Sequence, residues 1–508
     1  MERSLARCRR AVRQVVSRAL GWSLADQALV SGCNFAIGVL LARHFGVAGF
    51  GTYVIAQTCM QYANTFQSAL VVSPMFTAIP LERNPTAQHE LLRGFFAYTI
   101  AVLLTTSVGV LLVAWTLSRW LPALALDGLG LPLGVAMISF QVQDWLRRAL
   151  YVNTADHAVF LGDLMAYGGQ GAALAFLAWH GELGLGVALW VLAGSFALSA
   201  AGIAAALKLS PDFGGGVTVM RAHWRSSRDY LLFSQWQWLA VSGVILIGTG
   251  FIGVRAAGAI RAAQNLLGPV NVLFQWMDNV ISVRAALCLR DGGRQQLARF
   301  LNRLNWIGLV AFGLFALLSM AIDGWLMDTV YGPDYRPFAV LIVLQAIYNL
   351  LSYLYRMQTY YHRVLGNTGV VARSSFWWAL VSASCAVMTV NVLAERGIMM
   401  ALLVGEATGL LYLLWVKRES EADTTDTADK YLQWQWRGRM RLVLPVANRR
   451  VLSGALNMYV PSTRTGRLYR RLLGIGLPVL ARTGRGQSFG GTRRWAVDLP
   501  RLAEMVPG

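Results

Sequence analysis

Charge is what this sequence has least of. Charged side chains make up 14% of its 508 residues, whereas an average soluble domain carries about 25%. Lysine is nearly absent, with three residues against 42 arginines. The five cysteines form no CxxC pair, and the six histidines are scattered. These shortages argue against a soluble globular protein, and they predict no disulfide framework, no metal site and no other cofactor.

Apolar residues take the place of the missing charge. The residue types AVILMFWYC make up 56% of the chain, and the mean hydropathy is +0.48. The net charge of +20 could indicate a nucleic-acid partner. However, the basic residues stand between hydrophobic runs and do not gather on one soluble domain. The composition therefore predicts an all-α integral membrane protein whose partner is the lipid bilayer and not nucleic acid.

Twelve hydrophobic runs are long enough to cross a bilayer as helices. They lie near 22–43, 49–79, 92–117, 122–143, 157–179, 183–207, 229–250, 254–285, 303–329, 337–358, 371–393 and 397–416. The fourth is the weakest, because Asp127 and Pro132 interrupt it. With the N-terminus inside, the inner segments before the tail carry 22 Lys and Arg, against 6 for the outer ones. Basic residues favour the cytoplasmic side, so we expect both termini to be cytoplasmic.

Six helices in each half make both halves enter the membrane from the same side. A pseudo-two-fold axis along the membrane normal should therefore relate the halves. Pro211 and the glycines Gly214–Gly216 predict a flexible turn between them. The run Trp22–Ala42 is too long for the core of an ordinary signal peptide, so we expect it to be retained. The expected organisation is a basic cytoplasmic segment at 1–21, a six-helix N-lobe at 22–208, a cytoplasmic connector at 209–228, a six-helix C-lobe at 229–416 and a basic cytoplasmic tail at 417–508.

A short stretch of the first half recurs in the second half, 207 residues later. Gly46, Val47, Gly51, Ala56, Gln57 and Asn64 correspond to Gly253, Val254, Gly258, Ala263, Gln264 and Asn271. Matching residues at one fixed spacing indicate an internal repeat. Two related halves of one transmembrane unit are typical of secondary transporters.

Each copy of this repeat carries a row of polar residues. In the second copy the row is Arg261, Gln264, Gly268, Asn271, Gln275 and Asp278, and in the first it is Gln57, Gln61, Asn64 and Ser68. Spacings of three and four stack side chains on one face of a helix, here over roughly 25 Å. A mostly apolar helix with one polar face is expected to line a watery cavity. Gly268–Pro269 is expected to kink the second of these helices.

Arg261 is the most informative residue of the two polar rows. Inside a cavity its guanidinium would attract an anion such as phosphate. Alternatively, its side chain could reach the outer membrane interface and bind no ligand. The amides could bind sugar hydroxyls, or they could join helices to one another. The candidate substrate-binding residues are Arg261, Gln264, Asn271, Gln275, Gln57, Gln61 and Asn64.

Four carboxylates within or at the ends of the expected spans are candidates for coupling transport to a proton or a sodium ion. They are Asp26, Asp163, Asp278 and Glu406. Burial disfavours the charge of a carboxylate, so such a group can take up and release a cation. For Asp26 and Asp278, near the cytoplasmic ends of their spans, an interfacial or capping role is the alternative. Gln143–Arg148 is expected to end the fourth span on the cytoplasmic side.

Several stretches of the expected twelve-helix core resemble a known family. They are Leu24–Gly32 with Asn34 and Phe35, Leu40–Arg43, Phe50–Tyr53, Gln143–Asp144 with Arg147–Arg148, and Arg261–Gln264 with Gly268–Pro269. In these residues the chain resembles bacterial polysaccharide flippases of the Wzx type, in the multidrug/oligosaccharidyl-lipid/polysaccharide (MOP) exporter superfamily. The resemblance covers about 23–416. It implies two six-helix lobes around a central cavity that opens alternately to each side of the membrane.

The resemblance also implies a function. Such a flippase moves an undecaprenyl-diphosphate-linked oligosaccharide to the outer leaflet of the bacterial cytoplasmic (inner) membrane, for exopolysaccharide or O-antigen synthesis. Other polysaccharide-assembly proteins are then reasonable partners. Two alternatives stay open. A multidrug or cation antiporter has the same architecture, although its cavity is expected to be more acidic and aromatic. A membrane polymerase or ligase typically has a long outer loop with catalytic basic residues, and every expected outer loop here is short, so we expect no enzyme.

Overall fold

The computed structural model describes residues 2–82, 84–120, 126–152, 156–422, 488–489 and 492–493. The chain divides into two compact units, Met1–Lys417 and Arg418–Gly508. In the second unit, β1 (Ser488–Phe489) pairs with β2 (Thr492–Arg493) in an antiparallel register that joins Ser488 to Arg493. Most of the predicted basic tail, and the side chains of the predicted basic segment at 1–21, lie outside the described residues.

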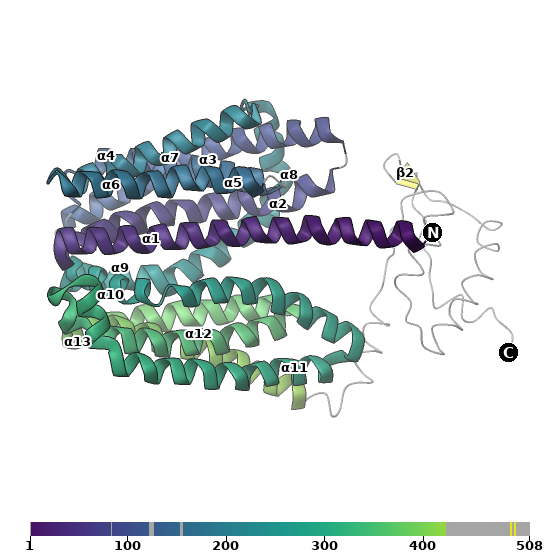
Figure 1. Ribbon diagram of the computed structural model, residues 1–508. Coiled ribbons are helices and arrows are strands. Elements are labelled where there is room, and N and C mark those ends of the chain that lie inside the picture. The colour runs from purple at the N-terminus through teal and green to yellow at the C-terminus, as the bar shows by residue number, and fades with distance from the viewer. Residues whose placement is uncertain are drawn as a thin grey trace, which may run out of the picture. The chain divides into compact units, whose positions relative to one another are not determined.

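The described part of the first unit is built from helices that run side by side along one direction (Figure 1). In order they are α1 (Glu2–Gln67), η1 (Ser68–Val72), α2 (Ser73–Ala78), η2 (Ile79–Leu81), α3 (Pro85–Trp120), α4 (Gly130–Val152), α5 (Asp156–Asp163), η4 (Leu164–Gly168), α6 (Gly169–Trp179), α7 (Leu185–Leu207), α8 (Phe213–Trp238), η5 (Leu239–Gly243), α9 (Val244–Ile252), α10 (Val254–Leu266), α11 (Pro269–Tyr331), η6 (Pro333–Phe338), α12 (Val340–Val364) and α13 (Thr368–Ala422).

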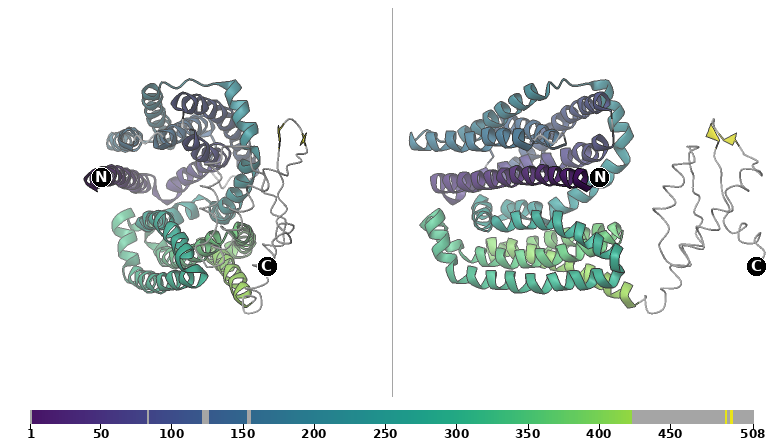
Figure 2. Two further views of the ribbon diagram at one scale, coloured as in Figure 1. Left: turned by 90° about the vertical axis from the view of Figure 1, so that its right-hand side faces the viewer. Right: turned by 45° about the vertical axis from the view of Figure 1, so that its right-hand side comes forward.

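The helices gather in two groups. In the end-on view, α3 to α7 lie on one side and α11 to α13 on the other (Figure 2, left). One hydrophobic core, which includes Phe50, Ala257 and Ile342, joins the two groups. Two smaller cores lie within them, one around Trp145 and the other around Tyr360. The groups therefore meet mainly through α1 and α10, the two helices that carry the internal repeat.

Breaks in the backbone divide the longest helices. In α1 the break is at Gly46 (φ 65°, ψ −175°), in α11 at Gly292 and Gly293, and in α13 at Ala394. Gly253, between α9 and α10, has a conformation close to that of Gly46 (φ 93°, ψ 167°). Glycine adopts a positive φ without the steric penalty that a Cβ brings. The sequence repeat thus places the same glycine turn before both copies.

Seven helices of the described residues are long and apolar enough to cross a membrane. Large apolar side chains stand exposed along them, among them Val108, Leu112, Leu198, Leu318 and Val392. A soluble monomer seldom exposes so much apolar surface, whereas lipid tails would cover it. The chain is therefore an all-α membrane protein, and the number of twelve spans and their orientation stay predictions.

Two predictions of local structure were wrong, one on the bounds of a helix and one on a flexible turn. The fourth span was expected near 122–143, but α4 begins at Gly130 and continues to Val152, so Gln143–Arg148 lies inside the helix. Polar residues had indicated an end where the helix in fact has a buried polar face. The expected flexible turn is also mostly helical, since α8 begins at Phe213. Asp212 caps α8 by accepting a hydrogen bond from Gly215 N at 3.1 Å.

Candidate functional site

A cavity lies between the two copies of the repeat. Its volume is about 90 Å³. Four predicted substrate-binding residues line it: Gln57 and Gln61 from α1, and Arg261 and Gln264 from α10. The rest of the lining is Val54, Thr58, Val241, Ser242, Ile245, Ala257 and Ile260. Val241 and Ser242 belong to η5, a π-helical turn, and such turns often mark functional sites.

Arg261 faces this cavity without a counter-charge. Among the described residues no carboxylate forms an ion pair with its guanidinium, and the ionisable side chains that act on it are Tyr53 and Tyr331. Both tyrosine side chains are buried, and a neutral phenol supplies no negative charge to balance the guanidinium. A cation held away from water is costly unless an anion accompanies it. A guanidinium on a cavity wall without a counter-charge is suited to an anionic ligand.

The other three predicted substrate-binding residues lie outside the cavity lining. Asn271 and Gln275 are exposed on α11. Asn64 lies further along α1, where its Oδ1 is buried and makes no hydrogen bond with a described residue. The predicted kink at Gly268–Pro269 is confirmed, because α10 ends at Leu266 and α11 begins at Pro269. This break separates the cavity face from the exposed amides that follow it.

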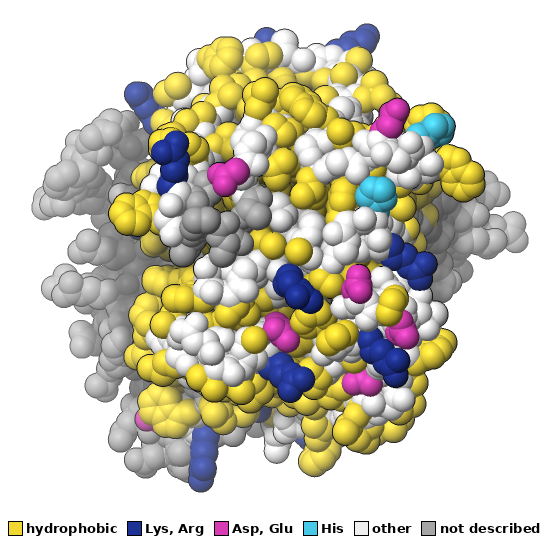
Figure 3. Space-filling view, turned by 90° about the vertical axis from the view of Figure 1, so that its left-hand side faces the viewer, with side chains coloured by type: hydrophobic (Ala, Val, Ile, Leu, Met, Phe, Trp, Pro, Cys, Tyr) yellow, Lys and Arg dark blue, Asp and Glu magenta, His cyan; other side chains and the backbone are white. Residues whose placement is uncertain are grey.

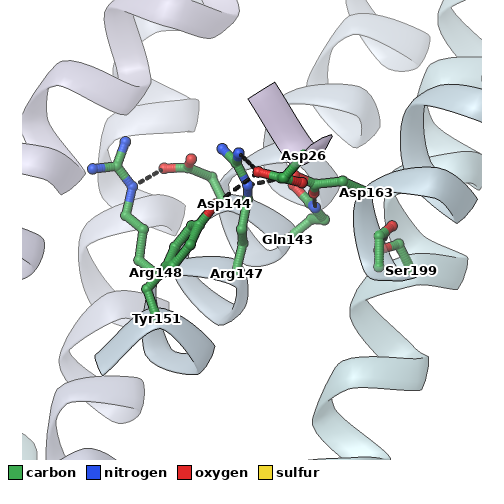
Figure 4. A network of polar contacts seen from close by, with 9 residues as sticks. Asp26, Gln143, Asp144, Arg147, Arg148, Tyr151, Asp163 and Ser199 are labelled. Atoms are coloured by element: carbon green, nitrogen blue, oxygen red, sulfur yellow. Dashed lines mark hydrogen bonds and ion pairs between the residues drawn. The ribbon is translucent and has the colours of Figure 1, made fainter. Parts of the chain in front are cut away.

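Two of the predicted coupling carboxylates lie together in the first group of helices (Figure 4). Arg147 of α4 forms ion pairs with Asp26 of α1 at 2.8 Å and with Asp163 of α5 at 2.5 Å. Tyr151 Oη donates a hydrogen bond to Asp26 Oδ2 at 2.7 Å, and Gln143 Nε2 donates to Asp163 Oδ1 at 2.9 Å. Asp26 is 1% and Asp163 0% exposed. Asp26 and Asp163 are therefore buried around one guanidinium, and a coupling or interfacial role for Asp26 stays a prediction.

The charges of this Asp26–Arg147–Asp163 cluster do not balance. If both carboxylates are ionised, the single guanidinium leaves one negative charge in a buried place. Oδ1 of Asp26 also has no hydrogen-bond partner among the described residues. A proton or a small cation would remove the excess charge. The sequence analysis did not predict that Arg147 pairs with these carboxylates. The spacing of four residues between Arg147 and Tyr151, which places both on one helix face, was the available signal.

The other two carboxylates lie in the second group of helices and differ in their surroundings. Asp278 is half-exposed and forms an ion pair with Arg356 at 2.6 Å, and Tyr360 donates a hydrogen bond to it. Glu406 is 1% exposed and accepts hydrogen bonds from Ser352 Oγ at 2.7 and 2.8 Å. Within the described structure no basic side chain forms an ion pair with Glu406. Glu406 is thus a buried carboxylate held by hydrogen bonds and not by an ion pair with any described residue.

Comparison with known proteins relates the chain to others through its fold. No family model matches the sequence, and no curated protein matches it. Among solved structures, the chain is similar to the inward-facing form of a multidrug resistance MATE family transporter of the MOP superfamily. The TM-score is 0.59 at 14% identity, over 79% of this chain and 96% of that one. It is also similar to the lipid II flippase MurJ in an inward closed conformation, with a TM-score of 0.60 at 12% identity, over 78% of this chain and 87% of that one.

At such low identities the likeness concerns the fold. Both matched structures are transporters and not enzymes. The expected resemblance to the MOP superfamily is confirmed at this level, and the narrower resemblance to Wzx-type flippases stays a prediction. The chain has the fold of the MOP superfamily transporters.

Proposed function

We propose that this protein is a flippase. It would move an undecaprenyl-diphosphate-linked oligosaccharide from the inner to the outer leaflet of the bacterial cytoplasmic membrane by alternating access. The observation that carries the proposal is the uncompensated guanidinium of Arg261 in a cavity lined by Gln57, Gln61 and Gln264. A guanidinium matches the geometry of phosphate oxygens, and amides can both donate to and accept from sugar hydroxyls.

The proposal includes an arrangement in the membrane. Twelve spans form an N-lobe at 22–208 and a C-lobe at 229–416, with both termini cytoplasmic. Support comes from the inner excess of basic residues and from the long apolar helices with their backbone breaks. In that arrangement the repeat lies at the junction of the lobes. A shared substrate site at such a junction is usual in transporters built from repeats.

The size of the cavity indicates how the cycle must run. A site for a drug-sized ligand has a volume of about 300–1,000 Å³, whereas this cavity has about 90 Å³. The two copies of the repeat must therefore separate before a diphosphate with its first sugars can reach Arg261. Burying the diphosphate in hydrocarbon without a cation would be very costly. Arg261 and the glutamines would replace the water that the headgroup leaves behind.

A multidrug or cation antiporter is the second candidate, since one of the matched folds is a multidrug resistance transporter. The cavity argues against it. A cationic drug would meet the guanidinium of Arg261, and the buried carboxylates lie elsewhere, in the Asp26–Arg147–Asp163 cluster and at Glu406. The antiporter predicts that cations are expelled, whereas the flippase predicts that an anionic lipid is moved.

We further propose that the excess charge of the Asp26–Arg147–Asp163 cluster or of Glu406 is neutralised by the coupling ion. Glu406→Gln is expected to keep the free energy of unfolding within about 1 kcal/mol of the wild type, because the amide retains an oxygen that accepts from Ser352. If Glu406 is the coupling group, a proton gradient imposed on vesicles should no longer accelerate translocation by this variant. Glu395→Gln, at the break in α13, is the control. Wild-type acceleration in Glu406→Gln would exclude Glu406.

The flippase proposal is tested by locating the lipid-linked oligosaccharide. The gene is deleted in a polysaccharide-producing host, and sided enzymatic probes on membrane vesicles report which leaflet holds the intermediate. We expect the intermediate to accumulate on the cytoplasmic leaflet and a plasmid-borne wild-type copy to clear it. If repeat units instead reach the outer leaflet normally and stay unpolymerised, the protein is an assembly enzyme and the flippase proposal is wrong.

A further inference from the structure

Two glycines, one from each copy of the repeat, let α1 and α10 cross with their backbones in contact. A Cβ on Gly51 would overlap the carbonyl oxygen of Val254, and a Cβ on Gly258 would overlap the carbonyl oxygen of Val47. Both glycines are buried. Close approach of two helix backbones requires residues without side chains at the contact. The crossing is therefore possible only with glycine at both positions.

The crossing is symmetric in the sequence as well as in space. Gly51 and Gly258 are 207 residues apart, and so are Val47 and Val254. Gly51 contacts Val254, and Gly258 contacts Val47, so the 207-residue shift of the repeat converts each contact into the other. Such reciprocity is expected where two related units meet on their symmetry axis. The crossing lies where the two copies of the repeat meet, close to the glycine turns Gly46 and Gly253.

The crossing directly borders the cavity. Val54 and Gln57 of the cavity lining follow Gly51 on α1 within two turns, and Arg261 follows Gly258 on α10 by three residues. On the other side of the crossing, each helix begins at a glycine turn, Gly46 or Gly253. Along α1 and α10, the packed backbone of the crossing therefore lies between Arg261 and that end of the helices.

A second contact holds the same end together. Arg43 of α1 donates hydrogen bonds to the carbonyl oxygens of Val330 at 2.7 Å and Thr329 at 2.5 Å, in the last turn of α11. A cation is favoured there, because the last carbonyls of a helix carry a partial negative charge. Figure 3 shows this end of the molecule, with arginine and acidic side chains among apolar ones. Arg43 thus ties the two groups of helices together beside the crossing.

We propose that the Gly51–Gly258 crossing, with Arg43 beside it, is the gate that closes the cavity on the outer side. The inference rests on the proposed transport function and on the predicted orientation of the membrane. Opening then requires α1 and α10 to move apart as rigid helices, which also breaks the bonds of Arg43. The crossing closes through the backbone, so its strength depends mainly on residue size at Gly51 and Gly258, and the hydrogen bonds of Arg43 add a smaller contribution.

Gly51→Leu should hold the gate open. In a background without the five native cysteines, Ser242→Cys places a thiol in the cavity lining. A membrane-impermeant maleimide is added to the outer side of intact cells, and the rate of labelling is measured. Because the leucine overlaps backbone, the closed form is disfavoured, and labelling should be faster by about tenfold or more. Gly258→Leu should have the same effect, by symmetry.

Gly32→Leu is the matched control, since Gly32 lies on the same helix and a Cβ there would meet no atom within 4 Å. Its labelling should equal that of the parent. If Gly51→Leu does not insert, Gly51→Ala is measured in the same way, because even one methyl group overlaps the carbonyl of Val254. Unchanged labelling in the inserted glycine variants, or an equal increase in Gly32→Leu, overturns the gate.

This experiment is independent of the substrate. Labelling of Ser242→Cys needs no lipid-linked oligosaccharide, so the gate can be confirmed even if the substrate proposal is wrong. Conversely, the leaflet assay can support the flippase while the labelling contradicts the gate. Arg43→Ala should accelerate labelling less, by about threefold, because it removes hydrogen bonds and leaves the crossing intact. If Arg43→Ala accelerates labelling more than Gly51→Leu does, the arginine and not the glycine crossing closes the cavity.

Discussion

Arg261→Ala is expected to lower the rate of translocation by about 100-fold while the protein still inserts and folds. The substitution removes the cation in the described cavity lining and leaves Gln57, Gln61 and Gln264 in place. A diphosphate entering the altered cavity would lose its counter-charge in a site partly shielded from water. Removal of one partner of a desolvated charge pair carries a cost of several kcal/mol. The leaflet assay measures the effect, with the amount of inserted protein as the reference.

Two further variants, Arg261→Lys and Arg255→Ala, test whether the loss of translocation is specific to the guanidinium of Arg261. Arg261→Lys keeps the charge but loses the planar fork that binds phosphate through two bonds, so we expect an intermediate rate. Arg255→Ala is the control, because Arg255 is exposed and lies over the ring of Phe338 at 5.9 Å. Equal loss in Arg255→Ala would indicate a general effect of positive charge. Export of a cationic drug that improves in Arg261→Ala would favour the antiporter.

Arg147→Ala is expected to destabilise the protein by about 3–5 kcal/mol. The side chain is 16% exposed and pairs with two buried carboxylates, Asp26 and Asp163. Without the guanidinium both carboxylates stay buried with no cation beside them. The loss is a large part of the stability of a typical protein. We expect a lower melting temperature in detergent and a smaller yield of monodisperse protein.

Arg148→Ala is the matched control for this prediction. Arg148 follows Arg147 in α4, its side chain is 32% exposed, and it pairs with Asp144 one turn away at 2.8 Å. Arg148 is more exposed than Arg147 and pairs with one carboxylate instead of two, so its removal should cost clearly less stability than that of Arg147. The double variant Arg147→Ala with Asp163→Asn should recover part of the lost stability, since it removes one of the two uncompensated charges. Equal destabilisation by Arg147→Ala and Arg148→Ala would mean that the cluster does not stabilise the fold.

Much of the helical framework could be predicted from the sequence, because its signals are local. Long apolar runs indicated membrane helices, the Gly268–Pro269 break was expected from proline chemistry, and the 207-residue repeat pointed to two related stretches. The spacing of polar residues correctly placed Gln57, Gln61, Arg261 and Gln264 on one shared cavity. The predicted bounds of the fourth span were wrong because they relied on local signals, Asp127 and Pro132. The buried polar face of α4 depends on packing against other helices and gives no such local signal.

Periodicity within one helix fixes which residues share a face, and for this protein it determined the helices, their breaks and the polar rows. It does not fix how each helix is rotated against the next. Tertiary packing alone therefore decided that Asp26 and Asp163 share Arg147, which is 121 residues from Asp26 in the sequence. Packing also decided that Asn271 and Gln275 lie outside the cavity lining and that Gly51 lies on Gly258, because such contacts depend on the position of whole helices.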